Sequence, residues 1–534
     1  MAHVPFDILI RGGRIVDGSG SPWYRGDAAV AGDRIAAVGA LGGAPARRIV
    51  EAEGKVVCPG FVDLHTHGDL VHLANPDCAP RVMQGVTTDV IGQDGLSYAP
   101  VDGPTLAYFR TAMKPINGDP PGLSYDWRSV EEFLARFDGK TSINVAYLVP
   151  HAPVRVLAMG GAVDRRPTES EMRHMKDLVD RGMRQGCVGF STGLTYAPMS
   201  FASAGEIAEL CSVAGQYGGA FMPHLRSYGT KVVEAMDEAI DIARTSGIAL
   251  HLTHHQVVFP INEGRVQAYL DVIDRARADG MDVTCDSYPY VAGSTFLRGF
   301  FPGWTQRMSI LEFVDALSDP TARVRIRHEL EDVGCDGSHG VPIDWTKVQI
   351  SGVKTEKNAG CVGKRIADAA RQAGTRPFDF AAELLAAEEG EVACVTFFGF
   401  ENAVQAIMRH PAHMVASDAI LTGAKPHPRA WGCHARYLAR YVRELGILRL
   451  EEAIRKMTAA PAARIGLSDR GLVKAGLAAD LVVFDPAMIR DTATFEDPRR
   501  HPTGVQTVIV NGRVVVDDGK HTHERAGRAL KPAR

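Results

Sequence analysis

The sequence predicts an α/β fold, a (β/α)8 TIM-like barrel with a small β-domain built from both chain ends. Three observations predict it: apolar strand-like segments alternate with amphipathic helical ones in the middle, hairpin patterns occur at both ends, and a long stretch separates the last two strand-like segments. Near-continuous apolar strands alternating with helices are typical of a parallel sheet, and eight of them of a barrel. The eight segments are FVDLHTH, VTTDVIGQDG, SINVAYLVPH, CVGFSTGL, GAFMPHLRS, ALHLTHHQ, DVTCDSYPY and HMVASDA.

Near both chain ends, apolar and polar residues alternate as they do in the strands of short β-hairpins. DILIRGGRIVDG and DAAVAGDRIAAVG alternate around glycine turns, and Asn511-Gly512 in VQTVIVNGRVVVDDGK predicts a type I′ turn. Isolated hairpins of this length are only marginally stable in water, so we expect the strands of the two chain ends to pair with each other. We therefore predict a small β-domain of residues 1–57 plus 468–534 and a barrel of residues 58–467.

An insertion is predicted between strands seven and eight, at about residues 297–400. This stretch contains several helical segments and a possible strand, KVQISGV. A structureless loop of such length is uncommon inside a compact domain, whereas a lid over an active site is common. We expect the insertion to cover the barrel mouth.

Bulk composition excludes several classes of function. The 534 residues carry a formal net charge of -4, without a basic run or basic–aromatic interleaving, so no nucleic-acid partner is expected. No apolar run is long enough to span a membrane, and the first residues lack a signal-peptide pattern. Nine cysteines without CxxC spacing fit reduced thiols in a cytoplasm. The oligomeric state stays open, a homo-oligomer included.

Polar residues gather where the predicted strands end. His65 and His67 close the first strand and project from one face, as two metal ligands or two structural histidines would. Side chains at the C-terminal ends of barrel strands converge, so four histidines plus one or two carboxylates predict one closed or two adjacent open transition-metal sites. The polar strand-end residues are His65, His67, Asp94, His151, His224, His254, His255, Tyr288 and Asp418.

Asp418 follows the eighth strand in MVASDA. It suits the N-cap of the next helix, because Asp is a favoured capping residue. It also suits a carboxylate that contacts the metal site and moves a proton to and from the reacting water. The histidines at the neighbouring strand ends favour the second interpretation.

The order of motifs resembles the amidohydrolase superfamily, and more narrowly its D-aminoacylase (N-acyl-D-amino-acid deacylase) branch, along essentially the whole chain. The motifs are CPGFVDLHTH, GVTT followed by DG-x-S-x-AP, GFSTGLTYAP, HLRSYG, LTHHQ, DSYPYVAGST, SDA and HPRAWG. The resemblance implies an exocyclic amide of a small N-acylated substrate, cleaved by metal-activated water. It also implies Zn2+ as the metal, as one or two ions.

The resemblance also implies roles for individual residues. Asp418 would be the general base and then acid, and would contact the metal, whereas His255 would not bind it. The implied metal ligands are His65, His67, His224 and His254, and the implied substrate-binding residues are Tyr196, Tyr288, Ser294 and Arg429, with Arg226 and Gln256 as further candidates.

Two departures from the family pattern matter. Asp94 stands in GQDG where the best-known members carry a metal-bridging Cys in GNCG. A carboxylate is a harder donor that still bridges two metals, so other divalent metals become candidates; alternatively, Asp94 only shapes the turn before Gly95. Gln256 stands where the family tends to have Lys, and Gln can only hydrogen-bond a substrate carboxylate. We therefore expect relaxed carboxylate recognition.

Two other interpretations stay in view. A cyclic-amide, hydantoinase-like hydrolase would share the first strand, but those enzymes rely on a carbamylated lysine on strand four, and residues 186–196 contain no lysine. A catalytically inactive barrel scaffold would not need the four histidines and Asp418. The acyl chain, the amine, the stereochemistry and the metal count are left open.

Overall fold

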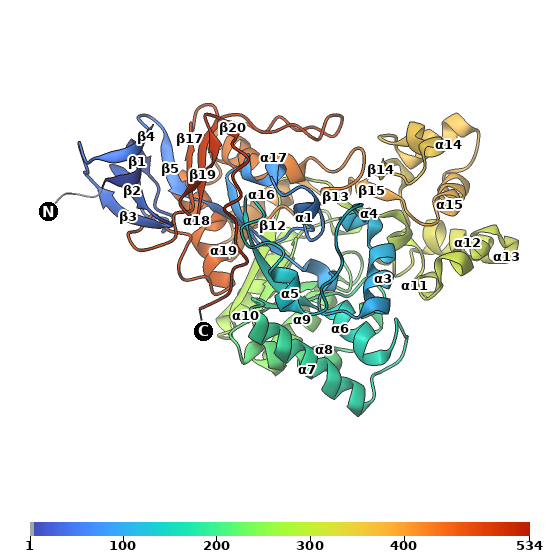
Figure 1. Ribbon diagram of the computed structural model, residues 1–534. Coiled ribbons are helices and arrows are strands. Elements are labelled where there is room, and N and C mark those ends of the chain that lie inside the picture. Colours follow the sequence, from blue (N-terminus) through green and yellow to red (C-terminus); the bar gives the residue numbers. More distant parts are fainter. Residues whose placement is uncertain (1–4, 534) are drawn as a thin grey trace.

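The computed structural model describes residues 5–533, and its central feature is the predicted barrel (Figure 1). Eight strands pair in parallel in the order β16-β12-β11-β10-β9-β8-β7-β6. A bridge between Thr66 and Ala419 joins the two edges, so the barrel is nearly closed. The strands are β6 (Phe61–Asp63), β7 (Val86–Ile91), β8 (Asn144–Pro150), β9 (Gly189–Gly193), β10 (Ala220–His224), β11 (Ala249–Leu252), β12 (Val283–Ser287) and β16 (His413–Val415).

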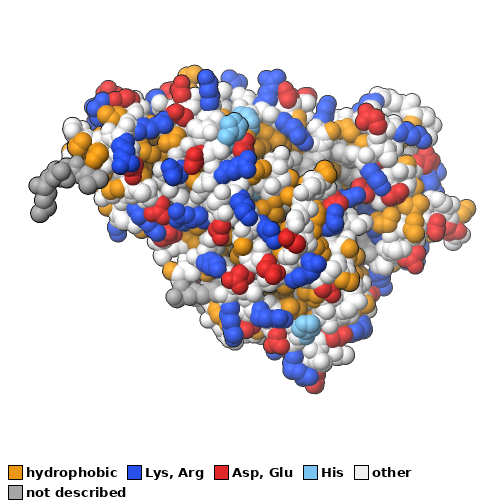
Figure 2. Space-filling model, in the orientation of Figure 1, with side chains coloured by type: hydrophobic (Ala, Val, Ile, Leu, Met, Phe, Trp, Pro, Cys, Tyr) orange, Lys and Arg blue, Asp and Glu red, His pale blue; other side chains and the backbone are white. Residues whose placement is uncertain are grey.

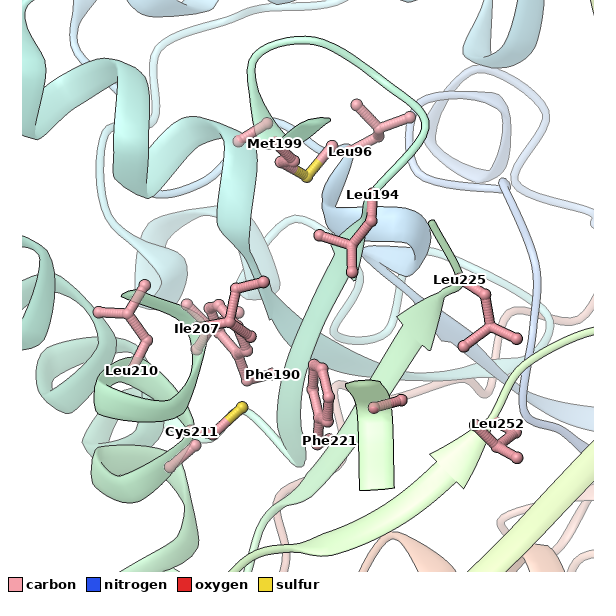
Figure 3. Packing of buried hydrophobic residues seen from close by; sticks show 14 of the residues in the cluster. Leu96, Phe190, Leu194, Met199, Ile207, Leu210, Cys211, Phe221, Leu225 and Leu252 are labelled. Carbon is pink, nitrogen blue, oxygen red and sulfur yellow. The ribbon is translucent and has the colours of Figure 1, made fainter. Parts of the chain in front are cut away.

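Amphipathic helices cover the barrel strands, as the alternation of segments predicts. Helix α7 (Glu169–Gln185) begins with a capping box at Thr168 and ends at Gly186, whose φ of 118° few other residues adopt. Helices α8 (Ala204–Gly215), α9 (Val232–Ser246) and α10 (Val266–Ala278) follow β9, β10 and β11. Figure 3 shows Ile207 and Leu210 of α8 packed toward Phe190 and Phe221 of the strands beneath. This packing fixes the strand ends that carry the polar residues.

Strands from both chain ends form one nine-stranded sheet beside the barrel (Figure 1). The N-terminal strand β5 pairs with the C-terminal β17, which confirms the split β-domain. Asn511 and Gly512 have φ of 46° and 77°, as a type I′ turn requires. The strands are β1 (Phe6–Ile15), β2 (Tyr24–Ala31), β3 (Arg34–Gly39), β4 (Ala46–Glu51), β5 (Val56–Pro59), β17 (Leu481–Phe484), β18 (Val505–Val510), β19 (Arg513–Asp517) and β20 (Lys520–His521).

The boundaries of this sheet differ in detail from the predicted ones. Residues 1–4 and 534 of the predicted β-domain lie outside the described residues. After β20 the chain leaves the sheet and runs along the barrel, where Ala529 bridges to Val145 of β8. The last described residues therefore reach the barrel, while Arg528 still pairs with Asp33 of the β-domain at 2.6 Å.

The insertion between β12 and β16 has its own small sheet and core. Strands β13 (Gly293–Phe296), β15 (Ala393–Thr396) and β14 (Val348–Gly352) pair antiparallel in that order, and β14 is the predicted strand. The sheet begins at Gly293, before the predicted start at about residue 297, because β13 pairs with β15. Helices α11 (Gly303–Gln306), α12 (Ile310–Ser318), α13 (Pro320–Arg327), α14 (Ile366–Ala373) and α15 (Pro377–Ala387) complete it.

A separate hydrophobic cluster holds the insertion together, with Phe313, Ile350 and Phe378 among its buried members. The insertion touches the barrel where Thr230, in the loop after β10, donates a backbone hydrogen bond of 3.1 Å to His339. Along residues 5–533 no helix combines the length and the apolar character that crossing a bilayer requires.

Candidate metal and active site

Six predicted site residues lie at, or just past, the C-terminal ends of five barrel strands. His65 and His67 follow β6, Asp94 lies in the short helix η1 (Gln93–Gly95) after β7, and His224 is the last residue of β10. His254 follows β11 and Asp418 follows β16. All six are at least nine-tenths buried. The structure therefore brings together the side chains that the sequence analysis named as metal ligands.

Asp94 lies between two pairs of histidines. His65 Nε2 is 3.6 Å from Asp94 Oδ1, and His67 Nε2 is 3.5 Å from Asp94 Oδ2. On the other side, His224 Nδ1 and His254 Nε2 are 3.0 Å apart and lie 3.7 and 3.5 Å from the same carboxylate. The arrangement forms two three-residue ligand groups that share Asp94.

Asp418 faces the first of these groups. Its Oδ1 lies 3.7 Å from His65 Nε2 and 3.3 Å from His67 Nε2. Its other oxygen, Oδ2, lies 2.8 Å from Nη2 of Arg429. One carboxylate thus meets the histidine cluster on one side and a buried guanidinium on the other.

Three site residues have left-handed backbone conformations. Asp94, His254 and Asp418 have φ of 55°, 33° and 48°. Non-glycine residues adopt this region at a cost, and such strain concentrates at functional sites. The neighbouring Asp286 on β12 stabilises one of them, because its Oδ1 accepts the backbone N–H of His254 at 2.7 Å. The surrounding structure therefore holds these side chains in place against local backbone preference.

The electrostatics suit a bound cation. Burial lowers the pKa of His65 to about 4, so this imidazole is neutral at physiological pH, as a metal ligand must be. Burial opposes the charged form of Asp418, but Arg429 and His65 outweigh it and hold its pKa below the usual range. Burial likewise opposes the charge of Asp94, and His65 and His224 lower its pKa well below the usual value. Two carboxylates stay ionised in a buried site.

Unpartnered buried atoms mark where a metal fits. Within the described chain, Nε2 of His65 and Oδ1 of Asp94 are buried and have no hydrogen-bond partner. Such orphans are rare in folded proteins, and at a functional site they suit the binding of a water molecule or an ion. Imidazole nitrogens and carboxylate oxygens are donors that zinc and other divalent transition metals accept. The residues present therefore fit the expected metal.

A cavity of about 130 Å³ opens onto the cluster. Four predicted substrate-binding residues line it: Tyr196, Gln256, Tyr288 and Ser294. Gln256 donates to the carbonyl of Tyr290 at 3.4 Å, and Ser294 donates to the carbonyl of Cys394 on β15 at 3.1 Å. Among the described residues that line this cavity there is no lysine or arginine.

The two arginines predicted to bind the substrate, Arg226 and Arg429, do not line this cavity. Arg226 pairs with Glu238 at 2.9 Å and donates to the carbonyls of Ser200 and Ala202, so its charge is already satisfied. Arg429 is fully buried behind Asp418, with its guanidinium 4.3 Å from the Tyr288 ring centroid. Both side chains are held by partners that sequence spacing does not reveal.

Two other strand-end histidines belong to different environments. His151 hydrogen-bonds Thr192 at 2.9 Å and Glu206 at 3.2 Å, away from the cluster. His255 packs against Tyr269, and burial lowers its pKa to about 4. The structure thus leaves both outside the ligand groups.

Thr195, Tyr228 and His339 are among the cavity residues to which the sequence analysis gave no role. Thr195 contacts Nε2 of His224 at 2.9 Å, and the Tyr228 hydroxyl contacts Nδ1 of His254 at 3.1 Å, so the opposite nitrogen of each ring faces Asp94. A hydrogen bond to the ring nitrogen that does not bind the metal fixes the orientation of a metal-binding imidazole. His339 of the insertion also lines the cavity, edge-on to Tyr228. The available signals were Tyr228 in HLRSYG and a histidine in the glycine-rich GCDGSHG.

Comparisons with known proteins agree with this geometry. A model described as the amidohydrolase family matches residues 48–516. A D-aminoacylase from Alcaligenes xylosoxydans xylosoxydans is 36% identical, over 98% of this chain and 98% of its own length.

Solved structures show the same likeness. The structure of N-acyl-D-glutamate deacylase from Bordetella bronchiseptica, complexed with zinc and a phosphonate inhibitor, matches with a TM-score of 0.84 and 34% identity, covering 99% of this chain and 100% of that one. A D-hydantoinase matches with a TM-score of 0.54 and 16% identity, covering 99% of each chain, a likeness in fold alone.

Proposed function

This chain belongs to the amidohydrolase family, in its D-aminoacylase branch, and on that premise we propose that it is a metal-dependent hydrolase of exocyclic, linear amide bonds. The substrate class is an N-acyl-D-amino acid or a related N-acyl amide with a weaker demand for a free carboxylate. The observation that carries the proposal is the pair of histidine groups on either side of Asp94, with Asp418 against one of them.

Five side chains would hold the metal, with Asp418 in contact with it: His65 and His67 on one side, His224 and His254 on the other, and Asp94 between them. Zinc, as one or two ions, is supported by the mixed nitrogen and oxygen donors and by the zinc in the solved deacylase relative. Because Asp94 is a carboxylate and not a thiolate, harder divalent metals are also candidates. When bound, the metal polarises the amide carbonyl and makes water nucleophilic at neutral pH.

Asp418 would carry the proton transfers. Its carboxylate accepts a proton from the attacking water and then delivers it to the amine nitrogen as the C–N bond breaks. The lowered pKa of Asp418, caused by Arg429 and His65 against the effect of burial, keeps the base ionised before attack. Thr195 and Tyr228 hold the imidazoles of His224 and His254 in fixed orientations.

The lining of the cavity supports the weaker demand for a carboxylate. Gln256, Tyr288 and Ser294 offer neutral hydrogen-bonding groups, and the described lining contains no lysine or arginine. Charge-assisted hydrogen bonds are roughly twice as strong as neutral ones. Selection for a free carboxylate should therefore be weaker than a lysine at position 256 would give.

Two rival functions are less well supported. A hydantoinase-like ring opener would need the carbamylated lysine that residues 186–196, around β9, do not contain. An inactive scaffold gives no reason for strained Asp94, His254 and Asp418 to converge. A cytoplasmic location is proposed from the nine cysteines, all free thiols. Homo-oligomer formation remains a prediction.

The test is a hydrolysis screen of the purified protein alongside elemental analysis. The screen covers N-acetyl, longer N-acyl and aryl amides of both enantiomers of several amino acids. It also covers the same N-acyl amides of matching amines that lack the carboxylate, and hydantoins. We expect linear amides to be cleaved and hydantoins to resist. Exclusive cleavage of hydantoins would favour the ring opener, and no turnover by the metal-loaded protein would favour the scaffold.

A further inference from the structure

A second, larger cavity lies beside the catalytic one, between the barrel and the insertion. Its volume is about 580 Å³, and its walls come from helix α3 (Gly103–Ala112), the loop that follows it, and the segment from β13 to α12. Most of the lining is apolar, including Leu96, Met113, Phe296, Met308 and Ile310. We call it the side cavity.

The side cavity shares a wall with the catalytic cavity. Tyr196 lines both of them. Its ring centroid lies 4.9 Å from that of His224, in the metal cluster, and 5.5 Å from that of Phe296, in the side cavity. The Tyr196 hydroxyl makes a hydrogen-bond contact of 3.4 Å to Thr295, and its side chain is the wall that the two cavities share.

The charged residues of the side cavity already have partners. Arg298 donates to the carbonyls of Thr305 and Met308 at 3.2 and 2.8 Å. Glu391 lies 3.5 Å from Nζ of Lys114, and Glu389 pairs with Lys354. What the cavity offers an occupant is therefore apolar surface.

The outer rim is also apolar. Tyr108 and Leu311, on its two sides, are 39% and 76% exposed. Figure 2 shows orange side chains over α11 and α12 and over the neighbouring surface near α3 and α4 (Lys114–Asn117). A chain that enters from the metal cluster would stay in apolar surroundings to the surface.

We propose that the side cavity binds the acyl chain of the substrate, so that amides of medium and long-chain acids are preferred over acetyl amides. The inference rests on the proposed function, because the scissile amide has to lie at the metal cluster while its acyl chain passes Tyr196. Burial of a methylene group gains about 0.8 kcal/mol, a factor of about four in kcat/KM. From acetyl to octanoyl we expect a rise of roughly 100-fold or more.

The experiment measures kcat/KM for N-acetyl-, N-butanoyl-, N-octanoyl- and N-dodecanoyl-D-leucine with the metal-loaded protein. Ala112→Trp fills the side cavity from α3, and Ala107→Trp is the matched control, exposed on the same helix outside the cavity lining. The octanoyl-to-acetyl ratio should fall about tenfold or more in Ala112→Trp and stay unchanged in Ala107→Trp. Equal kcat/KM along the wild-type series, or an unchanged ratio in Ala112→Trp, would overturn the inference.

A binding measurement separates this inference from the proposed function. Calorimetric titration with 1-decanol should show binding to the wild type and to Ala107→Trp, and a loss of binding in Ala112→Trp. If decanol binds in this pattern but no amide of any chain length is cleaved, the proposed function fails while the cavity stands as an apolar site. If N-acetyl-D-leucine is cleaved and decanol does not bind, the side cavity is not an acyl site.

Discussion

Nη2 of Arg429 lies 2.8 Å from Oδ2 of Asp418, and the guanidinium is fully buried. Burial alone would favour the protonated carboxyl, but the adjacent guanidinium charge of Arg429 opposes burial and helps to hold the pKa of Asp418 below its usual range. The carboxylate is therefore available as a base at neutral pH, and Arg429 acts on the proton transfer through Asp418.

Removing this guanidinium should change the pH dependence of turnover. In Arg429→Gln the pKa of Asp418 should rise, because the cation that favours its charged form is gone. A base with a raised pKa is lost at higher pH, so the acidic limb of the kcat/KM profile should move to higher pH. Arg436→Gln is the matched control, because Arg436 lies on the same helix α17 (Arg429–Arg436) and pairs with Asp491 at 3.1 Å. An unmoved limb, with KM raised only for carboxylate substrates, would return Arg429 to the substrate-binding role that the sequence suggested.

Asp418→Asn should fold and retain most of its metal but lose turnover by about 10²–10⁴, the usual contribution of general acid–base catalysis. Asn keeps the shape of the side chain but cannot accept the proton of water. Turnover, circular dichroism and elemental analysis on one preparation make the comparison. Turnover near that of the wild type would leave Asp418 as a residue that only shapes the loop after β16.

Asp94 should set both metal occupancy and metal preference. Asp94→Ala removes the carboxylate that lies within 3.7 Å of all four histidines, so occupancy should fall. Asp94→Cys should shift the preference toward zinc over manganese, because thiolate is the softer donor. Metal competition read by elemental analysis provides the test. Equal occupancy and selectivity in all three proteins would make Asp94 a turn residue.

Gln256→Lys should move the substrate preference toward free carboxylates. It would place a cation in a cavity whose described lining has none. The measurement is kcat/KM for a matched pair, an N-acyl-D-amino acid and the same amide without the carboxylate, in wild type and variant. We expect the wild type to cleave both and the ratio to rise in the variant. If the ratio is the same in both proteins, the carboxylate is recognised elsewhere.

The ligand cluster could be predicted because strand geometry decides it. His65 and His67 end a strand of a predicted barrel, and the C-terminal strand ends of a barrel converge whatever the loops do. The turn at Asn511-Gly512 was predictable for a similar local reason, since both residues tolerate positive φ. Local rules of this kind therefore predict the positions of strand ends in the barrel and the turns of the β-sheet.

The rest depends on tertiary contacts that no local pattern encodes. Arg226 could not be placed from HLRS, because its partner Glu238 lies a turn into α9. His339 lines the cavity from the insertion, where the loop after β10 binds its carbonyl. The start of β13 at Gly293 follows from pairing with β15, about 100 residues later. The cavity walls, unlike the ligands, come partly from the insertion.

The most direct test of the central claim is activity measured against metal content. The protein is stripped by chelation, its metal content is determined by elemental analysis, and zinc, cobalt or manganese is then added back in steps while hydrolysis of the best N-acyl substrate is followed. We predict negligible turnover without metal and recovery that tracks occupancy of the cluster of His65, His67, Asp94, His224 and His254. Full turnover by a protein shown to be metal-free would contradict the account.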